Sequence, residues 1–138
     1  MGLNIQSESI HINKEKITNL WQLIAEAHNY VEHTVTVQEV TQEQAQELNR
    51  KYRKKNKATN VLTFSYEEDE HDISLCLSLA QEEAKQRNIS MEEYVAILLA
   101  HAFLHVVGMD HTDDVGEKKM RQAELEFLGK ADFKQINL

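Results

Sequence analysis

Residues Tyr94 to Gly108 read YVAILLAHAFLHVVG, and this stretch predicts the centre of the protein core. It is apolar on nearly every side of a helix, and such a helix is buried on all its faces. Ser90 followed by Glu93 is a capping-box pattern that begins a helix, and Gly108 permits the left-handed turn that ends one. We therefore expect the other elements to pack around residues 94–107.

Hydrophobic periodicity outside this helix predicts alternating strands and helices. Strands are expected at residues 3–8, 34–40, 60–66 and 73–77, with an acidic turn at 67–72. Helices are expected at residues 17–31, from Thr41 (capped with Gln44) through Tyr52, from Ser78 to Asn88, and from Asp113 or Asp114 through Leu128, ended by Gly129. This order predicts an α+β (mixed α/β) fold with a roughly four-stranded mixed sheet packed by helices.

Length and composition set the broad class of the protein. With 138 residues the chain is expected to be one domain, 1–138, with residues 130–138 as a frayed tail. No apolar run approaches 18 residues and no secretory signal is visible, so we expect no membrane partner. The single cysteine, Cys76, lies in an apolar alternation and is interpreted as a packed thiol, which favours a cytoplasmic protein.

The pattern that carries chemistry is formed by three histidines, His101, His105 and His111. Residues four apart share one helix face, so the first two imidazoles lie within reach of one metal ion. The turn at Gly108 lets His111 return as a third ligand. Three histidines with an open fourth position are typical of a catalytic zinc site, which predicts one zinc ion per chain, although imidazole also suits nickel.

Two features of this site stay open in the sequence. The H-x₃-H-x₅-H spacing is also that of metzincin proteases, but Ala102 stands where a protease has its glutamate base. Asp110 is equally suited to orienting a ligand histidine and to moving a proton. The alternative for the histidines themselves is a structural role as hydrogen-bonded core residues. Each buried imidazole would then need a partner, because leaving it unsatisfied costs about 1–3 kcal/mol.

The charge balance is uneven along the chain. With 15 basic and 23 acidic residues the net charge is −8, which by itself argues against a nucleic-acid partner. Residues 50–57 reverse that conclusion locally, because they hold six cations without an acid between them. One or two would serve as helix C-terminal charges, whereas six indicate a phosphate-binding patch, as an RNA-binding surface has. These six are Arg50, Lys51, Arg53, Lys54, Lys55 and Lys57.

Together the two motifs resemble the YbeY family of metal-dependent endoribonucleases, linked to ribosomal RNA maturation and ribosome quality control. HAFLHVVGMDH (101–111) is similar to the family pattern H-G-x-L-H-L-x-G-[YF]-D-H. LNRKYRKKNKATNVLTF (48–64) is similar to L-N-x-x-Y-R-G-K-x-x-x-T-N-V-L-S-F. The departures are Ala102 and Lys54 in place of glycine, Met109 in place of an aromatic residue, and His71 before Asp72 where glycine is common.

The resemblance implies that His101, His105 and His111 hold the metal and that Arg53 lies beside the cleft. The expected activity is zinc-dependent, single-strand-specific cleavage of RNA in the 3′-end maturation of small-subunit ribosomal RNA, with His101 and Arg53 as catalytic residues and ribosomal partners possible. Two other functions remain open. One is a metallohydrolase acting on an amide or ester, which needs no basic run. The other is a non-enzymatic ribosome-associated binding module with a structural metal.

Overall fold

The computed structural model describes residues 2–6, 12–54, 59–109 and 113–133. Its strands and helices follow the predicted order. They are β1 (Gly2–Gln6), α1 (Lys14–His28), β2 (Thr34–Glu39), α2 (Gln42–Arg53), β3 (Val61–Glu67), β4 (Glu70–Leu75), α3 (Leu77–Arg87), α4 (Met91–Val106) and α5 (Asp114–Lys130).

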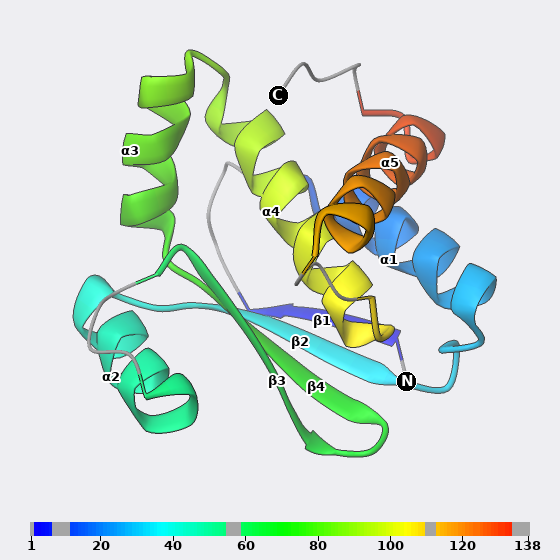
Figure 1. Cartoon of the computed structure of the whole chain (residues 1–138), viewed down its shortest axis with the longest axis horizontal. Coiled ribbons are helices and arrows are strands. Elements are labelled where there is room, and N and C mark those ends of the chain that lie inside the picture. Colours follow the sequence, from blue (N-terminus) through cyan, green and yellow to red (C-terminus); the bar gives the residue numbers. More distant parts are fainter. Residues whose placement is uncertain (1, 7–11, 55–58, 110–112, 134–138) are drawn as a thin grey trace.

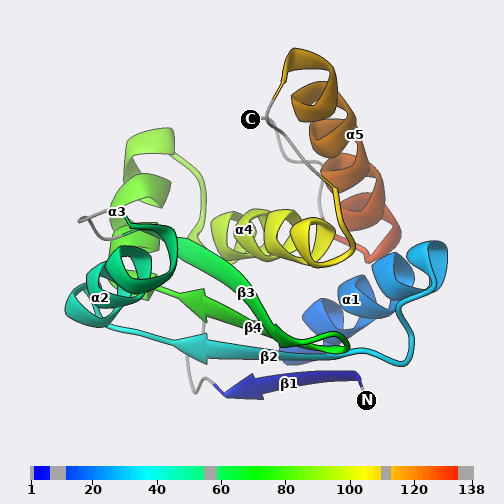
Figure 2. The ribbon, with the colours of Figure 1, turned by 60° about the horizontal axis from the view of Figure 1, so that its bottom comes forward.

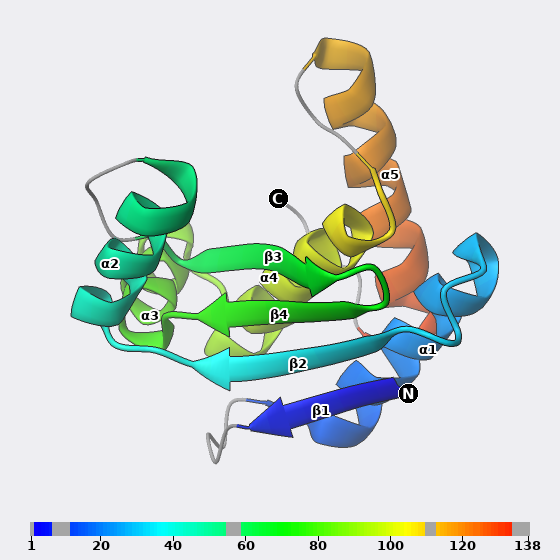
Figure 3. The same ribbon diagram turned by 90° about the horizontal axis from the view of Figure 1, so that it is seen from below.

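The four strands form one mixed sheet in the order β1-β2-β4-β3. β1 and β2 are parallel, as are β2 and β4, whereas β3 and β4 form an antiparallel hairpin. α1, α4 and α5 lie on one side of this sheet (Figure 2), and the strands are seen from the other side in Figure 3. The prediction of an α+β fold with a four-stranded mixed sheet is confirmed.

The core forms around α4, which crosses above the sheet between α3 and α5 (Figure 1). Most of its residues are buried, as its continuous apolar sequence predicts. Phe103 of α4 packs against Trp21 of α1, with ring centroids 5.3 Å apart, and both side chains are almost fully buried. Because α4 packs against α1, α3, α5 and β3, its position relative to the sheet is fixed. The side chains that it carries are positioned with it.

The helix ends show the expected local chemistry. Thr41 and Gln44 make both hydrogen bonds of a capping box at the start of α2. Ser90 caps α4, and Asp113 caps α5 by accepting from Gly116 N at 2.6 Å. Gly108, two residues after the end of α4, has φ +94°, a conformation that favours glycine.

Several predicted boundaries are wrong, for identifiable reasons. α3 begins at Leu77, so Ser78 is inside the helix and Cys76, which is buried as predicted, is the capping residue. α1 ends at His28 rather than Val31, because Asn29 adopts a left-handed conformation. α5 continues past Gly129 to Lys130. Residues 7 and 8 of the predicted first strand lie outside the described residues.

The predicted acidic turn at 67–72 is also wrong, because β4 begins at Glu70 and the turn is much tighter. His71 is paired with Val35 of β2 and Ser65 of β3 and is only 4% exposed. The side chains of His71, Ile73 and Leu75, at every second position of β4, are buried. The neighbouring carboxylates obscured this strand alternation in the sequence.

Across the described residues, no single helix has the length and apolar composition needed to cross a membrane. α3 and α4 meet that criterion only when taken together, and they are bent by 114° at the break between them.

Candidate active site

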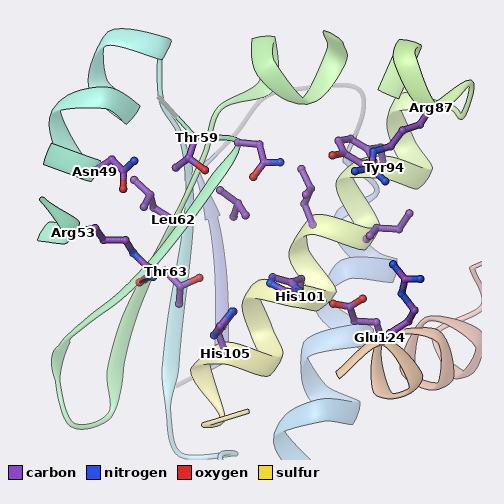
Figure 4. A pocket seen from close by; sticks show the side chains of 15 residues that line it. Asn49, Arg53, Thr59, Leu62, Thr63, Arg87, Tyr94, His101, His105 and Glu124 are labelled. Atoms are coloured by element: carbon purple, nitrogen blue, oxygen red, sulfur yellow. Dashed lines mark hydrogen bonds and ion pairs between the residues drawn. The ribbon is translucent and has the colours of Figure 1, made fainter. Parts of the chain in front are cut away.

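A pocket of about 460 Å³ lies between α4, the edge strand β3, the C-terminal parts of α2 and α3, and the middle of α5 (Figure 4). His101 and His105 of α4 line it from one side, and Arg53 and Thr63 from the other (Figure 4). The remaining lining residues are Asn49, Thr59, Asn60, Val61, Leu62, Arg87, Tyr94, Ile97, Leu98, Arg121 and Glu124. Residues from five elements therefore meet at one cavity.

His101 and His105 lie on the same face of α4, as their spacing predicts. Their ring centroids are 4.8 Å apart and the rings are nearly perpendicular. Both line the pocket, so neither is sealed inside the apolar core. This position favours a chemical role over the alternative of a structural core histidine.

The ring of His101 is held by a carboxylate that the sequence motif does not contain. Nδ1 of His101 donates to Oε1 of Glu124 on α5, with 2.6 Å between the two atoms. Glu124 is only 6% exposed, so the charge is in a shielded position where a charge-assisted hydrogen bond is strong. The bond fixes the tautomer that keeps the lone pair on Nε2, as metal-ligating histidines have. The sequence offered Asp110 as a candidate for this role, and Asp110 lies outside the described residues.

The residues present fit a metal ion. Two imidazoles share one wall of a pocket, and a buried carboxylate orients one of them, which is the donor set and the outer support that zinc prefers. His111, the third predicted ligand, lies outside the described residues. Within the part of the chain that the structure describes, no three His, Cys, Asp or Glu side chains are grouped as a metal site. The three-histidine site therefore stays a prediction.

Arg53 ends α2 and reaches the pocket from the side opposite α4. Its Nη2 atom donates to the Thr63 carbonyl oxygen of β3, with 3.4 Å between the atoms. Lys54 follows it with φ +57°, a left-handed conformation that glycine adopts more easily. Glycine stands at this position in the family pattern that residues 48–64 resemble, which agrees with this backbone conformation. The backbone of Lys54 turns the chain away, and Arg53 stays directed at the cleft (Figure 4).

The structure divides the basic run. Arg53 is the one described member that lines the pocket. Arg50 forms an exposed ion pair with Glu47, and the hydrogen bond between them raises the pKa of the guanidinium. Nζ of Lys51 lies 5.4 Å from the centroid of the Tyr52 ring. Lys55 and Lys57 lie outside the described residues, so their predicted contact with RNA has no structural description.

Sequence reasoning missed two further cations of the pocket, Arg87 of α3 and Arg121 of α5. The guanidinium of Arg87 lies 5.4 Å from the ring centroid of Tyr94, which also lines the pocket. Each is an isolated arginine in a mixed helical sequence, so no local pattern distinguishes it. The pocket thus has arginines on three different elements around two histidines, which suits an anionic ligand.

The polar end of the pocket is braced by Glu83. Its Oε1 atom accepts from Asn60 Nδ2 at 2.7 Å and from the Tyr94 hydroxyl at 3.2 Å. Burial, followed by the charge of Glu83, raises the pKa of Tyr94, so the phenol stays protonated and donates. These bonds join Asn60, which precedes β3, and Tyr94 of α4 to Glu83 of α3, and so they hold these walls of the pocket together.

Comparison with known proteins agrees with this geometry. Residues 3–132 match the family model described as endoribonuclease YbeY. An endoribonuclease YbeY of Francisella philomiragia is 28% identical, over 93% of this chain and 89% of that one. Its counterpart in a Janthinobacterium species is 41% identical over 75% and 74%. A Thermotoga maritima protein solved in solution has a TM-score of 0.61 at 26% identity, over 93% of this chain and 90% of its own. The chain therefore belongs to the YbeY family of metal-dependent endoribonucleases, whose general role is the processing of ribosomal RNA.

Proposed function

We propose that this protein is a zinc-dependent endoribonuclease that cleaves single-stranded RNA during 3′-end maturation of small-subunit ribosomal RNA and in ribosome quality control. The observation that carries the proposal is a pocket with His101 and His105 on one wall and Arg53 on the other, in a chain of the YbeY family. Residues 1–138 would form one catalytic domain.

His101, His105 and His111 are the proposed metal ligands, with one zinc ion per chain. Nickel is the main competitor, since imidazole ligands suit both metals. The bound ion would supply a Lewis acid and a water molecule of lowered pKa. The chain's own contribution begins with Glu124, which holds the ring of His101 in one orientation and one tautomer through the 2.6 Å bond to Nδ1.

Arg53 is the proposed phosphate ligand. A guanidinium binds two phosphate oxygens at once, and it stabilises negative charge that develops on them as the phosphodiester is cleaved. The hydrogen bond to the Thr63 carbonyl limits the positions that the side chain adopts before RNA arrives. Arg87 and Arg121 line the same pocket and would bind flanking phosphates. The proton acceptor is left unassigned between Asp110 and a group of the substrate.

RNA is the partner that an endoribonuclease requires, and the pocket arginines match its charge. The basic run Arg50, Lys51, Lys54, Lys55 and Lys57 is proposed to track the RNA backbone beyond the pocket. Ribosome-associated proteins are further proposed partners, and the cytoplasm is the compartment where ribosomal RNA would be met.

RNA cleavage and metal content in one set of variants test this function. The wild-type protein should cleave single-stranded RNA and bind one zinc ion per chain, whereas His101→Ala should lose both. His28→Gln is the matched control, because His28 lies at the end of α1 and does not line the pocket. Equal cleavage by wild type and His101→Ala would reveal a contaminating nuclease and contradict the assignment.

A second pair of variants separates RNA from a small amide or ester as substrate. Lys54→Glu combined with Lys55→Glu should greatly weaken RNA cleavage, because charge reversal repels the phosphate backbone. Hydrolysis of a small neutral substrate does not need those cations. Unchanged RNA cleavage in the double variant would count against an RNA-tracking role for the basic run.

A further inference from the structure

Tyr52 and Phe64 form a stacked aromatic pair beside the edge strand β3. Their ring centroids are 5.0 Å apart and the ring planes differ by only 10°. Phe64 pairs with Asp72 of β4, whereas the preceding Thr63 pairs with the buried Ile73. Successive side chains of a strand point to opposite faces, so Phe64 points to the face opposite that of Ile73. Neither ring lines the active-site pocket, so the pair lies outside it.

The ring of Tyr52 is exposed to solvent and lies near basic side chains. The residue is 54% exposed, although aromatic side chains of this size are usually well buried. It belongs to the last turn of α2, where Arg50, Lys51 and Arg53 are the basic residues. Nζ of Lys51 lies 5.4 Å from the ring centroid. An exposed ring with cations nearby is the combination that binds single-stranded nucleic acid, with the base stacked and the phosphate paired.

The neighbouring Tyr66 lacks this combination. It is 57% exposed, so it offers as much ring surface as Tyr52. However, it is followed directly by Glu67, Glu68, Asp69 and Glu70, which repel a phosphate backbone. The chain thus carries two exposed tyrosines near one strand, of which one lies among cations and the other beside acids.

We propose that the Tyr52–Phe64 pair is a stacking platform for one base of the single-stranded RNA substrate, outside the active-site pocket. Arg53 and Tyr52 are adjacent in the chain, with Arg53 in the pocket and Tyr52 stacked on Phe64. RNA that leaves the pocket past Arg53 crosses the edge of β3 and places a base on the Tyr52 ring. Lys51, weakly held over the exposed ring, moves to the adjacent phosphate.

This inference rests on the proposed function, because it takes single-stranded RNA as the ligand. Binding is therefore measured separately from cleavage. A labelled oligouridine of about 12 nucleotides is titrated with the full chain in the presence of a chelator, and the dissociation constant is read from fluorescence anisotropy. Tyr52→Leu should weaken binding about 5- to 150-fold, as the loss of one stacked base does. Tyr52→Trp should retain it, and Tyr66→Leu, the matched control, should leave it unchanged.

An abasic oligonucleotide of the same length distinguishes stacking from charge and from folding. It carries the same phosphates without bases, so Tyr52→Leu should bind it as the wild-type protein does. Equal weakening toward both oligonucleotides would overturn the platform, since a packing defect or a charge effect acts on both. Unchanged binding of oligouridine by Tyr52→Leu would overturn it as well.

A tryptophan reporter keeps the test decisive if Tyr52→Leu does not fold. In Tyr52→Trp the new indole should be quenched when oligouridine is added, whereas the buried Trp21 should not respond. Absence of quenching would overturn the platform. Failure of the wild-type protein to cleave RNA, combined with normal quenching, would contradict the proposed activity while supporting the platform.

Discussion

Nδ1 of His101 on α4 lies 2.6 Å from the carboxylate of Glu124 on α5, and this contact joins the two helices at the wall of the active-site pocket. Glu124 is buried, and this hydrogen bond gives its carboxylate a partner. The contact supports the proposed metal ligand from behind, and it links the position of α5 to the geometry of the site.

Replacing that carboxylate should weaken metal binding. Glu124→Gln keeps the shape of the side chain but removes the charge that raises the basicity of His101, so zinc affinity should fall about 10- to 100-fold. Competition with a chromogenic chelator measures the change. Glu126→Gln is the control, since Glu126 is exposed on the same helix and pairs with Lys130 at 3.1 Å. Equal affinities in all three proteins would contradict the role of Glu124.

Arg53 should be sensitive even to a conservative change. Arg53→Lys keeps the charge but loses the paired hydrogen bonds, and a lost charge-assisted bond of about 1.5–3 kcal/mol corresponds to roughly 10- to 150-fold in rate. The value of kcat on single-stranded RNA tests this. Arg50→Lys, which changes an exposed arginine paired with Glu47, should keep kcat. A similar loss in both variants would show that Arg53 has no special position.

The salt dependence of RNA binding should be modest despite the polyanionic ligand. Three pocket arginines predict a slope of log K against log salt of about −2, and each further cation adds about −0.7. Arg121→Gln should reduce the magnitude of the slope by about 0.7, and Lys130→Gln, whose lysine pairs with Glu126, should not. A slope equivalent to ten or more phosphates would contradict a confined binding face.

His71 should make the stability of the protein depend on pH. Its ring nitrogens lie 2.8 Å from His33 Nδ1 and 2.6 Å from Ser65 Oγ. Burial, and then His33, lower the pKa of His71 below 6.5, while Asp69 opposes them. The unfolded chain therefore takes up this proton at higher pH than the folded protein does. The free energy of unfolding should fall as pH drops below about 6.5, by up to about 1.4 kcal/mol per pH unit until the folded pKa is passed.

Urea unfolding of His71→Gln at several pH values checks this linkage. The variant should lose that part of the pH dependence, whereas His28→Gln should keep it. Burial raises the pKa of Asp72, which acts in the opposite direction, but Asp72 is present in all three proteins and so does not account for a difference between them. Parallel pH profiles of His71→Gln and the wild-type protein would contradict the assignment.

Replacing Lys54 by glycine should stabilise the folded protein. Its φ of +57° costs an L-residue about 1–2 kcal/mol, of which the greater flexibility of glycine in the unfolded chain offsets a part. Lys54→Gly should therefore raise the free energy of unfolding by roughly 0.5–1 kcal/mol in urea titrations. Lys51→Gly, the same change inside α2, should lower it by about 1 kcal/mol. Destabilisation by Lys54→Gly would show that the side chain has a structural contact.

Local patterns in the sequence predicted most of the architecture. Three of these patterns depend only on neighbours within a few residues: the apolar run of α4, the Thr41 capping box and the alternation within the strands. The structure confirms the helices and strands that they predicted. The pairing of His101 with His105 was predictable for the same reason, since residues four apart on a helix always share a face. The tight β3–β4 turn was not, because its carboxylates obscured the inward alternation of His71 and Ile73.

By itself, the sequence determined the secondary-structure order, the buried helix and the spacing of two histidines, because these follow from short-range periodicity. Only the tertiary structure decided that Glu124 supports His101 from 23 residues away, and that Arg87 and Arg121 join Arg53 in one pocket. It also decided that Arg53 and Tyr52, adjacent in the chain, lie at different surfaces, with Arg53 at the pocket and Tyr52 stacked on Phe64 outside it. These relationships depend on how whole helices pack against the sheet, and packing brings together residues whose separation in the chain follows no period.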